Sequence, residues 1–281
     1  MIHQIIQLHA TQNFSNLHDS GCFDPGIIIF FGAVKKLISL FSSLFLAITH
    51  AVLAHDAETS RPFQKFHAHQ IFESHSHAGW ESRYFSEGRD ALNGKSLWSG
   101  SFELGYDHFS GGVWYGRSSD HSYDEWQYNL SITQEMKGFE FYAGYTHLVF
   151  AKDDESDDEW SVGISYGDLP WDMESALDAT YSVDADGTFL EWSNGKSFSI
   201  SEAAELSANG IFGWNEGYVS DGHDGMNYFA FNLSGERALN ENFSLVGHGT
   251  QSWAIDRDLT YAGDDQLKDF FHVGIGIEWN F

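Results

Sequence analysis

The sequence predicts an all-β fold, a closed antiparallel β-barrel that crosses a membrane. Apolar and polar residues alternate with a period of two in several segments, the pattern of strands with two different faces. The apolar faces are rich in Trp, Tyr and Phe, whereas the opposite faces carry Ser, Gly, Asn and Glu, as in barrels with an apolar outer band and a polar interior. The predicted strands contain no proline, and within lipid only a closed sheet satisfies every backbone N–H and C=O group.

The composition excludes several other classes of protein. The chain has 281 residues, with 41 Asp or Glu against 14 Lys or Arg and a formal net charge of −27. So much negative charge repels a phosphate backbone, so we expect no nucleic-acid partner. With 42% hydrophobic residues the chain is too apolar for a disordered acidic protein. Its mean hydropathy of −0.32 excludes a bundle of membrane helices, each of which needs about 20 apolar residues.

The segment 34–54 has the features of a secretory signal peptide. Lys35 and Lys36 precede an apolar run that ends in small residues at Ala54. We therefore expect cleavage near Ala54. A single membrane anchor is the alternative, although the run is barely long enough to span a bilayer and contains several Ser residues.

Residues 1–33 are not expected to belong to the protein, because a signal peptide begins close to its basic region. We predict that translation starts at Val34 and that 1–33 is an extension created by a wrongly assigned start. Cys22, the single cysteine, lies in this segment. The mature chain then has no cysteine, which excludes disulfides, thiolate metal sites and cysteine nucleophiles.

Residues 55–78 form a polar leader without a clear period, so we predict a flexible histidine-rich arm in front of a barrel domain that begins at 79 and runs to 281. The arm contains two His-x-His pairs, and imidazole nitrogens are ligands of Zn²⁺, Cu²⁺ and Ni²⁺. The candidate weak metal ligands are His67, His69, His75 and His77. The alternative is a solvated tail, because a flexible arm loses conformational entropy when it closes around an ion.

The alternation is clearest at 97–107, 124–136, 160–166, 226–234 and 271–281. The last segment places Phe271, Val273, Ile275, Ile277, Trp279 and Phe281 on one face and His272, Gly274, Gly276, Glu278 and Asn280 on the other. Continuing along the chain predicts about twelve strands. They cover 80–87, 96–107, 112–118, 123–134, 139–150, 159–167, 175–184, 187–194, 204–214, 226–235, 243–254 and 270–281.

The predicted connections alternate in length. Longer acidic connections follow every second strand and tighter ones lie between them, as expected for long outer loops and short periplasmic turns. The short connection at 184–187 breaks this alternation, so ten strands remain an alternative.

The signal peptide and the aromatic C-terminal strand resemble those of Gram-negative outer-membrane β-barrel proteins of the porin-like type. The ending is similar to the insertion signal that such proteins present to the barrel-assembly machinery, and its residues are Ile275, Ile277, Trp279 and Phe281. The resemblance implies a location in the cell outer membrane, with its lipids and lipopolysaccharide as neighbours. The segments SRYFSEGR at 82–89, which opens the first predicted strand, and YAGYTH at 142–147 are similar to the barrel family Gcw_chp, which implies no known substrate.

Charged residues are expected on the inward face of the barrel. They are Glu81, Arg83, Glu103, Asp107, Glu125, Asp178, Glu191 and Glu278. Rings of carboxylates favour cations in a pore. Barrels of about eight strands have a filled interior and those of about sixteen an open channel, so we predict a narrow or plugged porin-like channel for small solutes or cations. The alternative is that these acids are hydrogen-bonded inside a filled interior.

The most enzyme-like feature is the DHFSGG segment at 107–112. Outer-membrane phospholipases and lipid A deacylases carry a His-x-Ser-Asn core in which His activates the Ser nucleophile, and His108 and Ser110 would share a strand face. However, Gly111 stands where that pattern has Asn, and the segment falls at a periplasmic turn. We therefore expect a glycine-rich hairpin turn and no enzyme, with a lipid hydrolase as a minor alternative.

Six carboxylates crowd into the seven residues DDESDDE at 153–159. Oxygen ligands suit Ca²⁺ and Mg²⁺, but the EF-hand spacing is missing, so we expect a solvated outer loop, no cofactor and at most loosely bound divalent cations. The acidic loops also give an alternative function. It is a structural or surface barrel without a channel, whose loops bind divalent cations, lipopolysaccharide or a partner.

Overall fold

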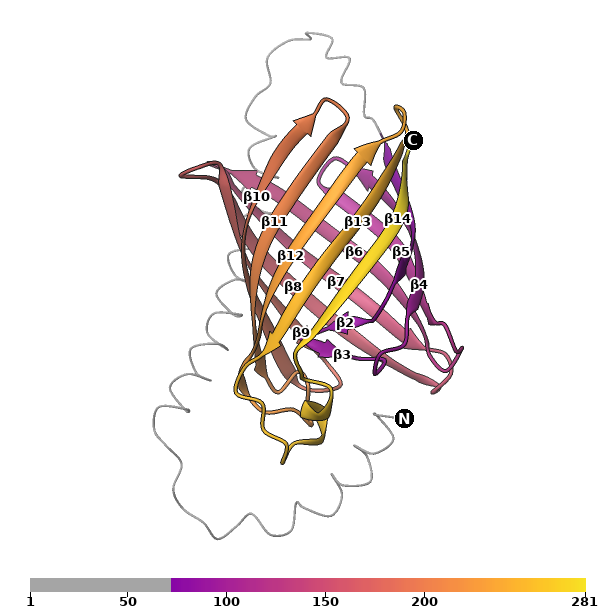
Figure 1. Ribbon diagram of the computed structural model, residues 1–281, viewed down its shortest axis with the longest axis vertical. Helices are drawn as coiled ribbons and strands as arrows, with labels where there is room; N and C mark the ends of the chain where they lie inside the picture. The colour runs from indigo at the N-terminus through magenta and orange to yellow at the C-terminus, as the bar shows by residue number, and fades with distance from the viewer. Residues whose placement is uncertain (1–71) are drawn as a thin grey trace, which may run out of the picture. The chain divides into compact units, whose positions relative to one another are not determined.

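The computed structural model describes residues 72–281, which form a closed antiparallel barrel (Figure 1). Its strands are β1 (Glu73–Glu81), β4 (Leu97–Tyr106), β5 (Phe109–Ser118), β6 (Asp124–Met136), β7 (Phe139–Phe150), β8 (Glu155–Leu169), β9 (Met173–Ser182), β10 (Gly187–Ser201), β11 (Ala204–Glu216), β12 (Gly225–Ala238), β13 (Phe243–Ala254) and β14 (Phe270–Asn280). Outside the barrel sheet lie the hairpin strands β2 (Phe85–Ser86) and β3 (Arg89–Asp90) and a short 3-10 helix, η1 (Ala262–Asp265). Within 72–281 the structure has no helix long and apolar enough to cross a bilayer.

The barrel closes where its first strand meets its last. Each barrel strand pairs with the next one in the sequence, and β1 pairs with β14, where Trp80 lies opposite Ile275. The closed sheet contains β1 and β4 to β14, which is twelve strands. The predicted barrel is therefore confirmed, and the alternative of ten strands is wrong. Every barrel strand has a partner on both sides, as lipid requires.

Burial along β14 follows the predicted alternation. Phe271, Val273, Ile275 and Ile277 are exposed on the outer surface, while the residues between them are buried against the interior. The two faces of this strand therefore meet different surroundings, as the period of two indicated.

Aromatic rings gather on the outer surface toward both ends of the strands. Near the long connections the ring centroids of Tyr115 and Trp126 lie 4.5 Å apart. Near the short turns the rings of Phe243 and Trp279 stack at 5.5 Å. Such groups at two levels match the aromatic girdles that flank the apolar band of a membrane barrel.

Two strands begin four or more residues earlier than predicted. β1 starts at Glu73 instead of 80, so 73–78 belong to the barrel and not to a flexible arm. Its outward positions before Trp80 are the small residues Ser74, Ser76 and Ala78, which give no apolar alternation to recognise. β8 starts at Glu155, so most of the acidic segment 153–159 is strand and only its first two residues lie in a turn.

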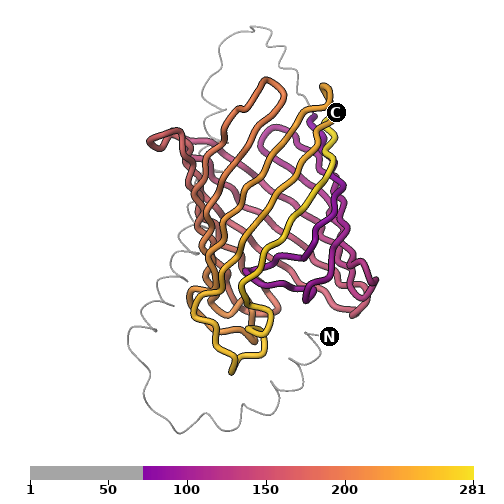
Figure 2. The backbone as a smooth tube through the Cα atoms, viewed as in Figure 1, coloured from indigo at the N-terminus to yellow at the C-terminus, as the bar shows by residue number. Residues whose placement is uncertain are grey.

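The connection between β1 and β4, residues 82–96, turns into the barrel (Figures 1 and 2). Glu87 and Gly88 both have positive φ, 46° and 78°, which makes the tight turn between β2 and β3. On one side the Tyr84 hydroxyl lies 3.0 Å from Glu125 of β6, and on the other the Phe85 ring packs against Tyr228 of β12. This inserted hairpin replaces the predicted continuation of the first strand over 82–87, and it crosses the lumen near the long-loop end.

Candidate functional site

The wall of the lumen is acidic. Side chains alternate between the two faces of a strand, and residues that lie opposite each other in paired strands point to the same face. Starting from the buried face of β14, the strand pairing therefore identifies the inward-facing residues of every barrel strand. The acidic residues of the inward set are Glu73, Glu81, Glu103, Glu125, Glu135, Glu140, Glu155, Asp157, Glu159, Glu174, Asp178, Glu191, Glu205, Glu236 and Glu278.

Basic residues of the barrel strands point the other way. Arg117 lies opposite Trp98, whose side chain is exposed on the outside, and Arg237 lies opposite the exposed Leu245. Lys196 sits over the exposed ring of Phe198. The described barrel strands contain no other Lys or Arg, so their inward face carries carboxylates without a strand cation.

The predicted lumen residues fall in three places. Glu81, Glu103, Glu125, Asp178, Glu191 and Glu278 lie on the inward face of barrel strands. Arg83 lies in the inserted connection, where its guanidinium forms an ion pair with the buried Asp90. Asp107 corrects the prediction, because it occupies the β4–β5 turn with a φ of 56° and has no strand face. Short polar side chains such as Asp tolerate this left-handed conformation.

Tyrosine hydroxyl groups hold a belt of four inward carboxylates, Glu125, Glu159, Asp178 and Glu191, which we name the carboxylate belt. Tyr84 and Tyr123 donate to Glu125, Tyr142 to Asp178, Tyr218 to Glu159 and Tyr228 to Glu191. A hydroxyl donor satisfies a carboxylate oxygen without bringing a positive charge. Each carboxylate of the belt therefore has at least one paired oxygen, and the pairing adds no positive charge to the interior.

The tip of the inserted hairpin brings one more carboxyl group to this belt. Burial raises the pKa of Glu87 to about 7, and the carboxylates of Glu191 and Glu125 act in the same direction. The Ser86 hydroxyl donates a hydrogen bond to Glu87, and the nearby Arg89 guanidinium also favours the charged form. The hairpin thus carries a group that titrates close to neutral pH inside the barrel.

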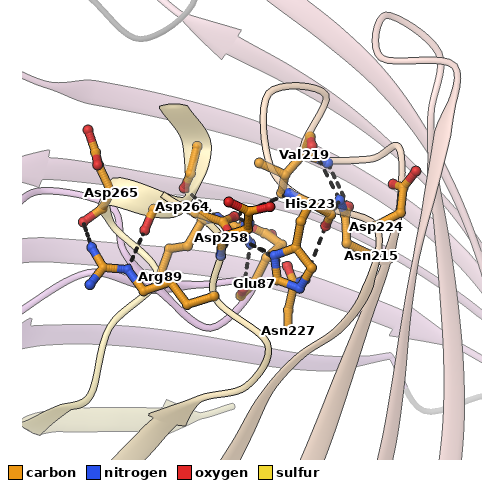
Figure 3. Close-up of polar contacts among 12 residues, drawn as sticks. Glu87, Arg89, Asn215, Val219, His223, Asp224, Asn227, Asp258, Asp264 and Asp265 are labelled. Atoms are coloured by element: carbon orange, nitrogen blue, oxygen red, sulfur yellow. Dashed lines mark hydrogen bonds and ion pairs between the residues drawn. The ribbon is translucent and has the colours of Figure 1, made fainter. Parts of the chain in front are cut away.

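A buried polar network lies at the long-loop end of the barrel (Figure 3). Arg89 of β3 donates to Asn227 Oδ1 at 2.7 Å and pairs with Asp264 Oδ1 at 3.1 Å. His223 Nδ1 lies 2.6 Å from the other oxygen of Asp264. Burial acts to raise the pKa of Asp264, but hydrogen bonds from the backbone of Asp258 and from His223 lower it below the ordinary value. The network joins the inserted hairpin to the connections 217–224 and 255–269.

Between the hairpin and the short turns, the lumen contains a cavity of about 330 Å³. Its titratable lining residues are His77, Glu81, Glu205, Glu236, His248 and Glu278. Lys and Arg are missing from this lining in the part of the chain that the structure describes. The cavity combines carboxylates and imidazoles, a set that suits cations rather than anions.

The His-x-Ser pair does not form a catalytic arrangement. Ser110 Oγ lies 2.7 Å from Ser131 Oγ across the β5–β6 pair, and His108 lies in the β4–β5 turn near Asp107. Within 72–281 no hydrogen bond joins His108 to Ser110. In this arrangement the Ser110 hydroxyl is paired with Ser131 and not with an imidazole.

The predicted metal ligands of the arm are divided by the start of β1. His67 and His69 lie outside the described residues. His75 and His77 are at inward-facing positions of β1. His75 Nε2 lies 3.7 Å from Glu278 Oε2.

Solved structures of outer-membrane proteins share this architecture. The KdgM porin is 7% identical in sequence, with a TM-score of 0.51 over 74% of this chain and 99% of that chain. The barrel has the fold of an outer-membrane porin. The NanC porin (9% identity, 73% and 98% coverage, TM-score 0.47) and an outer membrane channel from Pseudomonas putida F1 (10% identity, 79% and 100% coverage, TM-score 0.44) are similar over comparable lengths.

The comparisons at the level of sequence give no further relatives. No family model matches the chain, so the resemblance to Gcw_chp stays a prediction. No curated protein matches it either.

Proposed function

We propose that this porin-fold barrel is a narrow, cation-preferring channel of the Gram-negative outer membrane. The observation that carries the proposal is the charge of the wall, where carboxylates face inward and the strand Lys and Arg face outward. The proposal includes export by a signal peptide cleaved near Ala54. It also includes insertion through the barrel-assembly machinery by the strand that ends at Phe281, among lipids and lipopolysaccharide.

The preference for cations follows from the density of carboxylates. A monovalent cation about 7 Å from one carboxylate gains roughly 0.6 kcal/mol even at the dielectric constant of water. Four carboxylates line the cavity, Glu81, Glu205, Glu236 and Glu278. Together they favour a cation by about 2 kcal/mol at that distance and disfavour an anion by a similar amount, before screening by salt.

The expected pore is narrow because the hairpin occupies its cross-section. Tyr84 reaches β6 and Phe85 reaches β12, so the hairpin divides the lumen between two walls. The cavity of about 330 Å³ between the hairpin and the short turns is large enough for a small solute. We therefore propose small solutes and hydrated cations as the cargo.

Planar-bilayer recordings of the refolded full chain test the proposal. In a gradient of potassium chloride, the reversal potential should have the sign of a cation-selective pore. The combined variant Glu205→Gln, Glu236→Gln and Glu278→Gln should lower the cation-to-anion permeability ratio several-fold, because it removes three of the cavity carboxylates.

The matched control is Asp172→Asn, which removes a carboxylate whose side chain is 98% exposed at a turn. It should leave the permeability ratio unchanged. Anion selectivity of the unmodified barrel, or an unchanged ratio in the triple variant, would contradict the proposal.

A second function is favoured by the contacts at the long-loop end. The buried pairing of Arg89 with Asp264 ties the hairpin to the outer connections, as a barrel without a channel would require. Such a barrel would act at the surface, where acidic loops bind divalent cations, lipopolysaccharide or a partner. Absence of conductance steps from a barrel that still shows heat-modifiable migration would reject the channel and support this function.

A further inference from the structure

Two histidines and a glutamate from three neighbouring strands meet on the inner wall at the closure seam. Glu81 of β1 and His248 of β13 both pair with Gly274 of β14, one from each side, and His272 precedes Gly274 on the same face. Glu81 Oε2 lies 3.0 Å from His248 Nε2 and 3.8 Å from His272 Nδ1. One ligand atom from each residue lies within 4.8 Å of the others.

Gly274 makes room for this convergence. A Cβ atom at this position would lie 2.3 Å from Glu81 Oε1 and 2.4 Å from Oε2. Any side chain at 274 would therefore fill the space over which the carboxylate reaches toward the two imidazoles. The absence of a side chain at one register position creates the cradle.

The ring nitrogens of His272 make no hydrogen bond within the described residues, although Nδ1 lies 3.8 Å from Glu81 Oε2. The residue is 6% exposed. The hairpin ring of Phe85 stacks on the imidazole at 5.4 Å with an interplanar angle of 14°. Buried polar atoms without partners are rare in native proteins, and an unseen ion is one of their recognised explanations.

We propose that Glu81, His248 and His272 bind a divalent first-row transition metal ion, with Zn²⁺ the best match. Zn²⁺ takes imidazole nitrogen and carboxylate oxygen at about 2.0–2.2 Å, so neighbouring ligand atoms in a tetrahedral site are roughly 3.4 Å apart. The distances of 3.0 and 3.8 Å bracket this spacing. Two nitrogens and one oxygen leave a fourth position for water.

The ion would join strands that are far apart in the chain. Glu81 belongs to the first barrel strand, and His248 and His272 belong to the last two. A bound ion would therefore link β1 to β14 and β13 across the closure seam, next to the Phe85 ring that stacks on His272. The metal site does not depend on whether the barrel conducts ions, because all three ligands belong to the inner wall itself.

The test uses the refolded full chain in which His67, His69, His75 and His77 are all changed to Gln. This background removes the ligands that the sequence alone predicts. Zn²⁺ should bind with a stoichiometry of one per barrel by isothermal titration, and Co²⁺ should give the visible absorption bands of a low-coordinate site. Bound Zn²⁺ should also raise the temperature at which the barrel loses its folded electrophoretic migration.

In this background the variants Glu81→Gln, His248→Gln and His272→Gln should each weaken Zn²⁺ binding tenfold or more. The matched control is His147→Gln, which breaks a histidine–carboxylate pair with Asp158 of 2.8 Å that lies on the outward parity of β7 and β8. The control should keep the affinity. Heat-modifiable migration checks that each variant is folded.

X-ray absorption of the Zn²⁺-loaded background protein gives a result that needs no further variant. Two imidazoles with additional oxygen ligands are expected. A shell of oxygen atoms alone, no binding by the background protein, or full affinity in the folded Glu81→Gln and His272→Gln variants would overturn the proposal.

Discussion

Glu87 links the acidic interior to pH. Its pKa of about 7 means that the carboxyl group is neutral in mildly acidic medium and charged above neutrality. In the unfolded chain the group titrates near 4.5. Between pH 4.5 and pH 7 the folded barrel therefore binds this proton more tightly than the unfolded chain does. The resulting stabilisation is complete below about pH 4.5 and is lost as the pH rises through about 7.

We expect the free energy of unfolding to be lower at pH 8 than at pH 5, with at most about 3 kcal/mol due to Glu87. The variant Glu87→Gln should remove most of that part, because the amide cannot ionise beside Glu125 and Glu191. Denaturant titrations at the two pH values measure the difference. Glu202→Gln, at the exposed β10–β11 turn, is the control. A full pH dependence retained in Glu87→Gln would contradict the assignment.

At the scale of elements, a buried ion pair ties the inserted hairpin to the connection between β13 and β14, and Lys268 of that connection lies 3.6 Å from Asp90 of β3. Arg89 and Asp264 are 4% and 0% exposed, and their contact joins β3 to the connection between β13 and β14. Removing one partner from a buried pair leaves an uncompensated charge, which costs about 3–5 kcal/mol. Arg89 also donates to the carbonyl of Gly263 and to Asn227 Oδ1, so its loss removes several contacts of the hairpin and none of the barrel sheet.

The variant Arg89→Ala should therefore release the hairpin and leave the barrel closed. We expect faster proteolytic cleavage within 82–96 and a larger single-channel conductance, with unchanged heat-modifiable migration. The control is Lys95→Ala in the same connection, whose ion pair with Asp120 is about half exposed and contributes little. Equal cleavage and conductance in Arg89→Ala and the unmodified barrel would show that the hairpin is held by other contacts.

At the scale of the whole molecule, the strands could be predicted where their two faces differ. β14 alternates Ile and Trp with Gly and Glu, so its sequence reveals both its limits and its orientation. The first half of β1 was not predicted because its outward residues Ser74, Ser76 and Ala78 are small and give no apolar alternation. The inserted hairpin was not predicted because SRYF at 82–85 has the composition of a strand. Its inward position depends on its contacts with β6 and β12.

The site was predictable only in part for a similar reason. Inward parity could be assigned to Glu125 or Glu191 within a single strand. The partner of each could not, since Tyr84 and Glu125 are 41 residues apart and meet only in the closed barrel. The cluster of Glu81, His248 and His272 depends in the same way on the pairing of the first strand with the last.

The C-terminal residue has a structural place as well as its predicted part in assembly. Phe281 packs against Trp279 at 4.5 Å, and its backbone N–H donates to the carbonyl of Ser74 at 3.1 Å. Phe281→Ala should lower the amount of barrel recovered from outer membranes several-fold, while purified protein refolds in detergent as before. Phe271→Ala, another exposed outward residue of β14, is the control. Equal recovery of both variants would remove Phe281 from the insertion signal.

The inserted hairpin also constrains the order of folding. The hairpin directly follows the first barrel strand in the sequence. However, the contact that seats it, between Arg89 and Asp264, spans 175 residues and cannot form before the connection that precedes β14 is present. Ser74 and Phe281, 207 residues apart, meet at the opposite end of the same seam. Contacts of such long range form late and slowly. The hairpin can therefore be seated only after the connection 255–269 has been made, and a chain truncated before residue 262 would lack this seating contact as well as β14 and a closed wall.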